Sequence, residues 1–352
     1  MQLTLLVPEL LWPEPDDREA FNALICPELN TLIARSRLTR RPAQSLEATL
    51  TDAFGHPENA PYAAFRRLGE ADSAGDADDV YWFCCDPVHL RFHQEHLILA
   101  DSGSFDIEMA DAQALAEDLN RHFSDVGRFH VARAERWYFQ LIDKTLQGGC
   151  SVPPLSAVAG RSVDGFRPET ASEIAIHKLL TEVQMLLHDH PVNQARENDG
   201  QLAINSLWLW GAGAMPPRRE SGFDSVWSGD PLALGLARAA GVPTHPVALD
   251  AADFFKHAAP DTQHFVVLED LLTPVQYERS VAYCEALNGL EKRWFAPLRA
   301  ALRSGRIKQL QLIAPTAYAA LTWKSTRREQ WKLWRQAQTL GKIAHDLAQS
   351  ST

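Results

Sequence analysis

The chain has 352 residues and carries 45 acidic against 34 basic side chains, so its formal net charge is −11. This acidic balance argues against nonspecific nucleic-acid binding and against adhesion to an anionic membrane. The sequence lacks an apolar run of the roughly 18 residues that a membrane span needs, and its first residues form no basic leader. Five cysteines, odd in number and scattered, indicate reduced thiols, so we expect a cytoplasmic protein.

The N-terminal part is predicted to begin with a strand and to continue with helices. Leu3–Val7 is a short, continuous apolar run, which is typical of a buried parallel strand. Several prolines then indicate an extended loop. Phe21–Ile33 is predicted to be helical, with an interruption at Pro27.

A change of composition at Val80 marks a second block. Its predicted elements are two strands, a helix and two further strands, at Val80–Cys85, His96–Ala100, Met109–Phe123, Arg128–Val131 and Trp137–Ile142. A linker rich in glycine, serine and proline follows at Gly148–Arg167. Three arginines of this block could bind an anion or form surface salt bridges: Arg91, Arg133 and Arg136.

The middle of the chain carries the most informative stretch. A capping-box pattern begins at Thr170, and apolar residues at helical spacing continue from it to Leu187. The helix is predicted to stop before Pro191, because the residue preceding a proline is pushed out of the α region. We expect a turn there that presents three polar side chains together, those of His190, Asn193 and Arg196.

A buried strand with two tryptophans is predicted next, at Ile204–Trp210, and Gly211-Ala212-Gly213 ends it with a turn where backbone can approach a ligand. A helix end, a polar loop, a buried strand and a glycine turn are a common way to build a pocket. A plain connection between two domains is the alternative interpretation.

The last part of the chain alternates predicted strands and helices, at Ser225–Trp227, Leu232–Ala240, His264–Leu268, Tyr277–Leu290 and Ile307–Ile313. The basic tail from Trp323 to Leu347 is predicted to form an amphipathic helix packed on the core, and stacking of its tryptophans on nucleic acid is the alternative. Strands alternating with helices indicate an α/β fold with a mostly parallel sheet.

Two motifs carry a resemblance to known proteins. His190-Pro191-Val192-Asn193, the following Arg196 and the run Asn205–Gly213 resemble the crossover segment of archaeal-type cofactor-independent phosphoglycerate mutases. They resemble more closely a bacterial group of phosphoglycerate-mutase-like, RpfE-type regulatory proteins. Both groups belong to the alkaline phosphatase superfamily, and Cys26–Arg35 and Gly235–Gly241 are also similar to segments of that superfamily.

The resemblance implies an α/β fold of alkaline phosphatase type, with a mostly parallel sheet flanked by helices and a smaller inserted α/β domain. It implies that residues 1–79 form the first part of the core. Residues 80–205 would then form the inserted domain and crossover, and residues 206–352 the second part of the core with a C-terminal helix. Active mutases of this kind use a serine nucleophile and two divalent metals at strand ends.

The chain departs from the mutase pattern at each of these strand ends. No Asp-Gly pair follows the first strand, Pro274 stands where a histidine is required, and Ala314-Pro315 stands where an Asp-His pair is expected. We therefore expect a degenerate two-metal site, no metal cofactor, no identifiable catalytic residue and no activity. The alternative is an active Mn- or Zn-dependent mutase or phosphatase with relocated ligands, drawn from Glu9, Asp16, Asp270 and the histidines near His190.

The predicted ligand site is the cleft between the two domains, lined by His190, Asn193, Arg196, Asn205 and Trp210. We expect it to bind a small phosphorylated or carboxylate ligand, or else a protein partner, in a regulatory role, with neither nucleic acid nor a membrane as a partner. Arg196 is the preferred anion contact because its charge does not change with pH in the working range. The competing account is a structural salt bridge between this arginine and Glu182 or Glu197.

Overall fold

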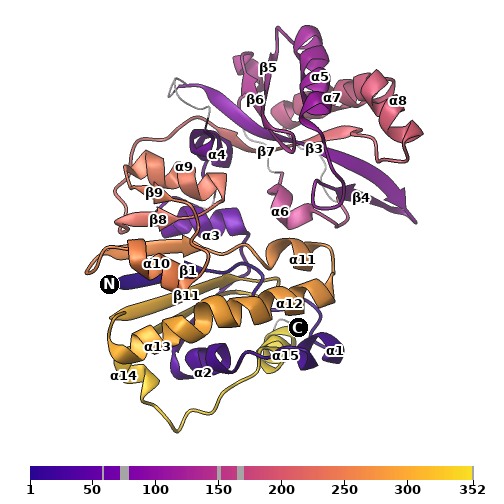
Figure 1. Cartoon of the computed structure of the whole chain (residues 1–352). Coiled ribbons are helices and arrows are strands. Elements are labelled where there is room, and N and C mark those ends of the chain that lie inside the picture. The colour runs from indigo at the N-terminus through magenta and orange to yellow at the C-terminus, as the bar shows by residue number, and fades with distance from the viewer. Residues whose placement is uncertain (58, 72–78, 149–151, 165–169, 351–352) are drawn as a thin grey trace. The chain divides into compact units, whose positions relative to one another are not determined.

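The computed structural model describes the whole chain except residues 58, 72–78, 149–151, 165–169 and 351–352 (Figure 1). The described chain divides into two compact units: unit 1 is Met1–Gly55 with Arg219–Thr352, and unit 2 is His56–Arg218. Unit 2 is wider than the expected insertion at residues 80–205, because the helix α4 (Tyr62–Gly69) packs against strands of this unit. Parts of the predicted linker at 148–167 lie outside the described residues.

Unit 1 contains a sheet of seven strands in the order β2-β12-β11-β1-β10-β8-β9. The strands are β1 (Gln2–Leu6), β2 (Arg37–Arg41), β8 (Ser225–Trp227), β9 (Thr244–His245), β10 (Gln263–Val267), β11 (Gln309–Pro315) and β12 (Ala320–Thr326). The pairings of β11, β1, β10, β8 and β9 are parallel, and β12 and β2 add two antiparallel strands at one edge. The predicted, mostly parallel core sheet is therefore confirmed.

Helices flank this sheet. They are α1 (Arg18–Asn22), α2 (Pro27–Arg35), α3 (Leu46–Ala53), α9 (Pro231–Ala240), α10 (Ala251–His257), α11 (Leu272–Gln276), α12 (Ser280–Leu290), the π-helical η2 (Glu291–Phe295), α13 (Ala296–Ser304), α14 (Arg327–Gln330) and α15 (Leu340–Ser350). In Figure 1, α2, α12 and α13 cover one face of the sheet, and α3 and α9 lie over the other. Among the described helices, none is both long and apolar enough to cross a membrane.

The strands of unit 1 are amphipathic, and only one of their faces contributes to the main core. Leu3 and Leu5 of β1 and Leu310 and Leu312 of β11 are at most 2% exposed and pack with the tryptophan Trp294 and its helical neighbours. Successive side chains on a strand point to opposite faces. The residues between these leucines therefore point away from the core, and they are polar.

Only the end of the C-terminal tail forms the predicted helix packed on the core, where Leu340 and Leu347 of α15 are buried. The part before it differs. Trp323 lies on β12, where Leu321 and Trp323 are buried in the core while Lys324 is exposed. The pattern of this segment has a period of two residues, so it extends the sheet instead of forming a helix. Trp331 and Trp334 follow the four-residue helix α14 and are 58% and 77% exposed, so they do not pack on the core.

Unit 2 is built on an antiparallel sheet in which β3 lies centrally and pairs with β4, β6 and β7. Its strands are β3 (Tyr81–His93), β4 (His96–Ala100), β5 (Gly127–Arg133), β6 (Arg136–Leu141) and β7 (Ser206–Gly213). Its helices are α4, α5 (Met109–His122), the 3-10 turn η1 (Lys144–Leu146), α6 (Leu155–Val158), α7 (Ala171–His188) and α8 (Pro191–Asn198). Apolar residues of α5 and α7 pack on this sheet and form the core of the unit.

A buried ion pair ties α4 to the sheet of unit 2. The Arg66 guanidinium donates from Nη1 to both carboxylate oxygens of Asp86 at 2.9 Å, and Asp86 is fully buried. The Trp210 indole donates to the same carboxylate at 3.0 Å. Burial raises the pKa of Asp86, while the Arg66 guanidinium and the Trp210 hydrogen bond oppose this rise. Because both charges are shielded from water, loss of one partner leaves the other uncompensated.

We predict that Asp86→Ala lowers the free energy of unfolding by about 3–5 kcal/mol, the usual cost of breaking a buried ion pair. Urea unfolding followed by circular dichroism measures this change. The matched control is Asp52→Ala, which breaks the exposed Arg41–Asp52 pair of unit 1 and should cost about 1 kcal/mol or less. Equal losses in the two variants would contradict a special role for the buried pair.

Candidate functional site

The crossover stretch begins as predicted and then differs. The capping box at Thr170 is present, and α7 runs from it to His188. The predicted turn after this helix is instead a second helix, α8, which starts at Pro191. A proline suits the first helical position because its fixed φ is already helical and its missing N–H has no intrahelical partner there. The His190 side chain caps α8 by accepting a hydrogen bond at Nδ1 from the Val192 backbone at 3.2 Å.

Asn193 lies on α8 and is 1% exposed. Its amide nitrogen donates to the backbone oxygens of Leu187 and Ile204, at 2.7 and 2.8 Å, and its amide oxygen accepts from the Ile204 nitrogen at 2.8 Å. The side chain therefore connects the end of α7 to the segment that leads into β7. Because all of these partners are backbone groups of unit 2, the buried Asn193 amide stabilises the fold of this unit.

Arg196 also lies on α8, and it is 4% exposed. Its guanidinium donates to the backbone oxygen of Leu202 at 2.9 Å, to the carboxylate of Asp111 at 3.0 Å and to the backbone oxygen of Asp106 at 2.7 Å. The structural salt bridge considered from the sequence is thus present. The partner expected there, Glu182 or Glu197, is wrong, because the side chain points back toward the start of α5.

The other three predicted site residues also contact protein groups in unit 2. His190 contacts the Asp118 carboxylate through Nε2 at 3.1 Å, and burial, with a smaller effect of Arg121, lowers the pKa of this histidine. Asn205 exchanges two hydrogen bonds of 2.8 Å with the Leu90 backbone. Trp210 donates to Asp86, as described above. All five residues stabilise unit 2, and their role in ligand binding stays a prediction.

The carboxyl ends of the parallel strands in unit 1 are the second candidate. Ligands of open α/β sheets usually bind there. Asp230, after β8, caps α9 by accepting from the Ala233 nitrogen at 2.7 Å. Asp270, after β10, forms an ion pair of 2.5 Å with Arg293. Glu9, after β1, has a left-handed backbone with φ of 56°.

The donors at these strand ends do not fit a two-metal centre. Such a centre needs several carboxylates or imidazoles that converge on the metals. In the described part of the chain, no three His, Cys, Asp or Glu side chains form a group that could hold a metal ion. After β11, the Tyr318 hydroxyl donates to the Pro13 oxygen at 2.5 Å, and burial raises the pKa of this tyrosine to about 12. Its phenol therefore stays protonated and holds the loop after β1.

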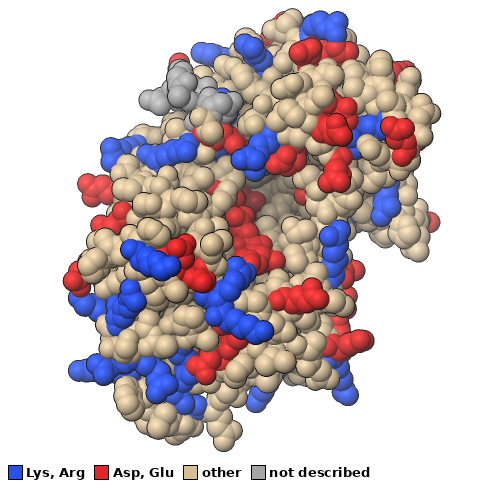
Figure 2. All heavy atoms as spheres, viewed as in Figure 1, with Lys and Arg blue, Asp and Glu red and all other residues tan. Residues whose placement is uncertain are grey.

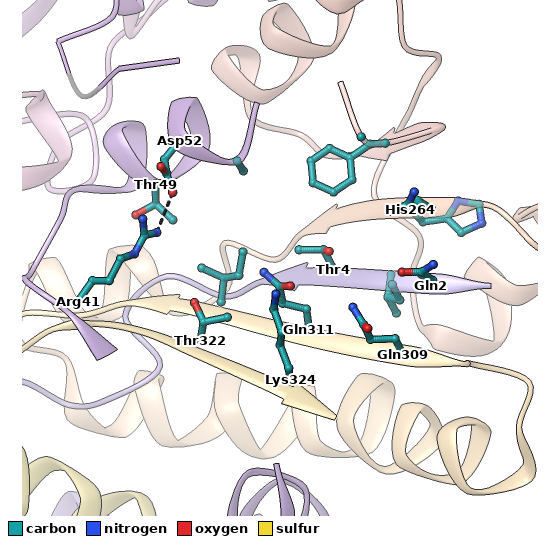
Figure 3. A pocket seen from close by; sticks show the side chains of 16 residues that line it. Gln2, Thr4, Arg41, Thr49, Asp52, His264, Gln309, Gln311, Thr322 and Lys324 are labelled. Carbon is teal, nitrogen blue, oxygen red and sulfur yellow. Dashed lines mark hydrogen bonds and ion pairs between the residues drawn. The ribbon is translucent and has the colours of Figure 1, made fainter. Parts of the chain in front are cut away.

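The third candidate is a cavity of about 400 Å³ on the face of the core sheet that points away from the leucines. Figure 3 shows polar side chains of three adjacent strands rising from its floor. We call these residues the polar face: Gln2 and Thr4 of β1, Gln309 and Gln311 of β11, and Thr322 and Lys324 of β12. Thr49 and Asp52 of α3 lie across the cavity from these strands, and Phe223 also lines it.

The register of the strands places these polar groups side by side. Gln2 is paired with Gln309, Thr4 with Gln311, and Gln311 with Lys324. Among the described residues, the Lys324 ammonium has no carboxylate within the 4.0 Å limit of an ion pair. The polar face thus offers amide and hydroxyl groups together with one uncompensated positive charge.

The remaining charged groups around this cavity are already paired. Arg41 forms a 2.7 Å ion pair with Asp52. His264 contacts Ser225 through Nδ1 at 2.7 Å, and its Nε2 lies 2.8 Å from the Thr262 hydroxyl. Burial lowers the pKa of His264, which favours the neutral imidazole at pH 7. Lys324 therefore supplies the excess charge of the cavity. The alternation of polar and apolar residues in the strand sequences, such as Gln-Leu-Thr-Leu-Leu at residues 2–6, is the signal that could have located this face.

Comparison with known proteins gives relatives of one kind. No protein-family model matches the chain. It is 25% identical over 217 residues to the 2,3-bisphosphoglycerate-independent phosphoglycerate mutase of Methanosarcina mazei, covering 57% of this chain and 51% of the mutase. It is 24% identical over 166 residues to a probable mutase of the same kind from Geobacter sulfurreducens, covering 46% of this chain and 41% of that protein. The matched segments thus span about half, or less, of these relatives.

Two solved structures are also similar. The PH0037 protein from Pyrococcus horikoshii matches with a TM-score of 0.55 and 13% identity, over 99% of this chain and 95% of that one. The cofactor-independent phosphoglycerate mutase from Thermoplasma acidophilum matches with a TM-score of 0.43 and 16% identity, over 93% and 90% of the two chains. The predicted alkaline-phosphatase-like α/β fold is confirmed. The resemblance to phosphoglycerate mutases is supported at low identity, and the closer likeness to RpfE-type proteins stays a prediction.

We predict that Arg196→Ala lowers the free energy of unfolding by about 2–3 kcal/mol, because it leaves the Asp111 carboxylate and two carbonyl oxygens without their charged donor. Chemical denaturation measures this loss. The matched control is Arg128→Ala, an exposed arginine of the same unit, which should change stability by about 0.5 kcal/mol or less. A wild-type stability in Arg196→Ala would show that the side chain is not structural.

Proposed function

We propose that this chain is a phosphoglycerate-mutase-like protein that has lost the two-metal phosphoryl-transfer centre and acts by binding a small anion, in a regulatory role. The observation that carries the proposal is that two carboxylates at the carboxyl ends of the parallel strands already have protein partners. Asp270 is paired with Arg293, and Asp230 caps α9. Each carboxylate thus already has a protein partner, and the positive charge of Arg293 beside Asp270 opposes a metal cation there.

The polar face is the preferred binding site under this proposal. Amide and hydroxyl groups both donate and accept hydrogen bonds, so they match the hydroxyl groups of a small polar molecule. Lys324 adds one positive charge, which matches a phosphate or a carboxylate. The ligand class that fits is therefore a small hydroxylated acid, phosphorylated or not. Binding of this kind requires no metal and no nucleophile.

The alternative is an active metal-dependent mutase or phosphatase whose ligands have moved to new positions. It would have to draw on Asp16, Asp270, Glu9 or the histidines near His190. Asp16 has a side chain that is 93% exposed, and its nearest basic partner is His345 at 3.9 Å. The Arg293 guanidinium beside Asp270 would repel a metal cation at that carboxylate. These two arrangements favour the binding protein over the enzyme.

We predict that the purified protein, incubated with Mn²⁺ or Zn²⁺, shows no phosphoglycerate mutase activity. An enzyme-coupled assay of 2-phosphoglycerate formation measures it, with an authentic mutase as the positive control. Turnover of about 1 per second or more, abolished by a chelator, would establish the active enzyme and overturn the non-catalytic assignment.

We predict that 3-phosphoglycerate, used as the probe, binds to the polar face and that Lys324→Ala weakens this binding about 10- to 150-fold, since a hydrogen bond to a charged group contributes roughly 1.5–3 kcal/mol. Isothermal titration calorimetry measures the dissociation constants. Gln311→Leu should also weaken binding, because it removes a neighbouring amide. The matched control is Lys178→Ala, an exposed lysine of unit 2. Equal affinity in wild type and Lys324→Ala would exclude this face as the site.

A further inference from the structure

A second concave surface of unit 1 lies beside the edge strand β2. It is a groove of about 920 Å³ between the end of α2, strand β2, Trp323 of β12 and the segment 329–346. Its basic lining residues are Arg37, Arg40, Lys332, Arg335 and Lys342, and its acidic ones are Glu329 and Asp346. We call this surface the basic groove. Its excess of positive charge contrasts with the net charge of −11 for the whole chain.

Three of the five basic residues that line the groove form no ion pair with a described residue. In the described part of the chain, Arg37, Lys332 and Lys342 have no carboxylate within 4.0 Å. Glu329 accepts a hydrogen bond from the Thr326 nitrogen at 2.9 Å as part of the capping box of α14. Figure 2 shows Lys and Arg side chains gathered at the end of unit 1 that carries α13 and α14.

The backbone of β2 offers a second kind of contact. All five residues of this strand, Arg37–Arg41, are exposed, and β12 pairs with one of its edges. No other described strand pairs with the opposite edge. A free strand edge presents N–H and C=O groups that can bind another extended chain. Because the strand carries three arginines, two copies of it would repel each other, whereas an acidic strand would be attracted.

Apolar side chains lie next to these charges. Trp331, Leu333 and Trp334 are 58%, 67% and 77% exposed, and they alternate with basic residues that line the groove. Leu38 of β2, unlike these three residues, lines the groove itself, and it is 45% exposed. Tryptophan and arginine are the residue types that contribute most to protein interfaces. A partner with both acidic and apolar residues therefore fits this surface better than a small ion does.

We propose that β2 and the basic groove bind an extended, acidic segment of a protein partner, which adds to the sheet as a further antiparallel or parallel strand. Alternate side chains of such a segment point to one face. One set, apolar, would meet Leu38 and the groove, and the carboxylates of the other set would meet Arg37 on the opposite face. Lys332 and Lys342 would attract the acidic segment through its net negative charge. Nucleic acid is disfavoured as the occupant, because the net negative charge of the chain repels it. It also has no peptide backbone that could pair with a strand edge. This inference is independent of the small-anion site on the polar face.

The test uses the full chain and a fluorescein-labelled peptide of alternating glutamate and valine. We expect fluorescence anisotropy to show binding that weakens as salt increases. The triple variant Arg37→Glu, Lys332→Glu and Lys342→Glu should lose about tenfold or more in affinity. The matched control, Lys178→Glu with Lys292→Glu and Arg128→Glu, changes the net charge equally at exposed sites elsewhere and should bind like wild type. Circular dichroism checks that both variants are folded.

Hydrogen–deuterium exchange tests the strand addition itself. The peptide should protect the amides of residues 37–41, and the same peptide N-methylated at alternate residues should neither protect them nor bind as well. Absence of peptide binding, equal losses in the two triple variants, or binding without protection of β2 would each overturn the proposal. Tighter binding of a single-stranded oligonucleotide of equal charge would overturn it in favour of a nucleic-acid surface.

Discussion

Apolar and polar side chains alternate with a period of two residues along β1, β11 and β12. The structure of unit 1 depends on this alternation. Helices α2, α12 and α13 need an apolar surface, and the leucines of these strands provide it on one face. The intervening side chains must then point to the other face. In a fully doubly wound sheet that face would also be apolar and covered. Here it carries glutamine, threonine and lysine side chains, so it remains accessible as the floor of a cavity.

The edge of this sheet that is formed by β12 and β2 accounts for the basic groove. The antiparallel strands β12 and β2 extend the parallel core without a helix to close it, which leaves β2 at the boundary of the sheet. The arginines of β2 prevent its edge from pairing with an identical edge, because like charges repel. Under our proposal they also favour an acidic chain at this edge. Charged residues that protect a strand edge against self-association can therefore also recognise a partner of opposite charge.

Unit 2 shows how residues of a recognisable motif can be needed for folding. Asn193 satisfies the backbone carbonyl groups of the buried residues Leu187 and Ile204, and Arg196 those of Leu202 and Asp106. An unpaired buried polar group costs more than a hydrogen bond gains. These positions are therefore constrained by the structure of the unit even in a protein without catalytic activity. Similarity to phosphoglycerate mutases in this segment is consistent with a shared fold as well as with a shared reaction.

The sequence by itself determined the elements of the core and the fold class. Continuous apolar runs and the capping box at Thr170 are local signals that correctly predict their elements, whereas the helix predicted over the segment of Trp323 is in fact the strand β12. Local signals also predicted the start of α7 and the absence of a helix across Pro191. They did not predict that α8 would begin at this same proline, because one residue type suits both a stop and a start.

Only the tertiary structure decided which polar residues are available. Arg196 and Lys324 are both basic residues next to apolar runs, and nothing in their local sequence distinguishes their roles. The first is 4% exposed and fully engaged by α5 and its neighbours, whereas the second faces a cavity. The difference arises from contacts between residues that are far apart in the chain, such as Arg196 with Asp111 and Gln311 with Lys324. Strand register and helix packing create these contacts, and neither is encoded within a single short segment.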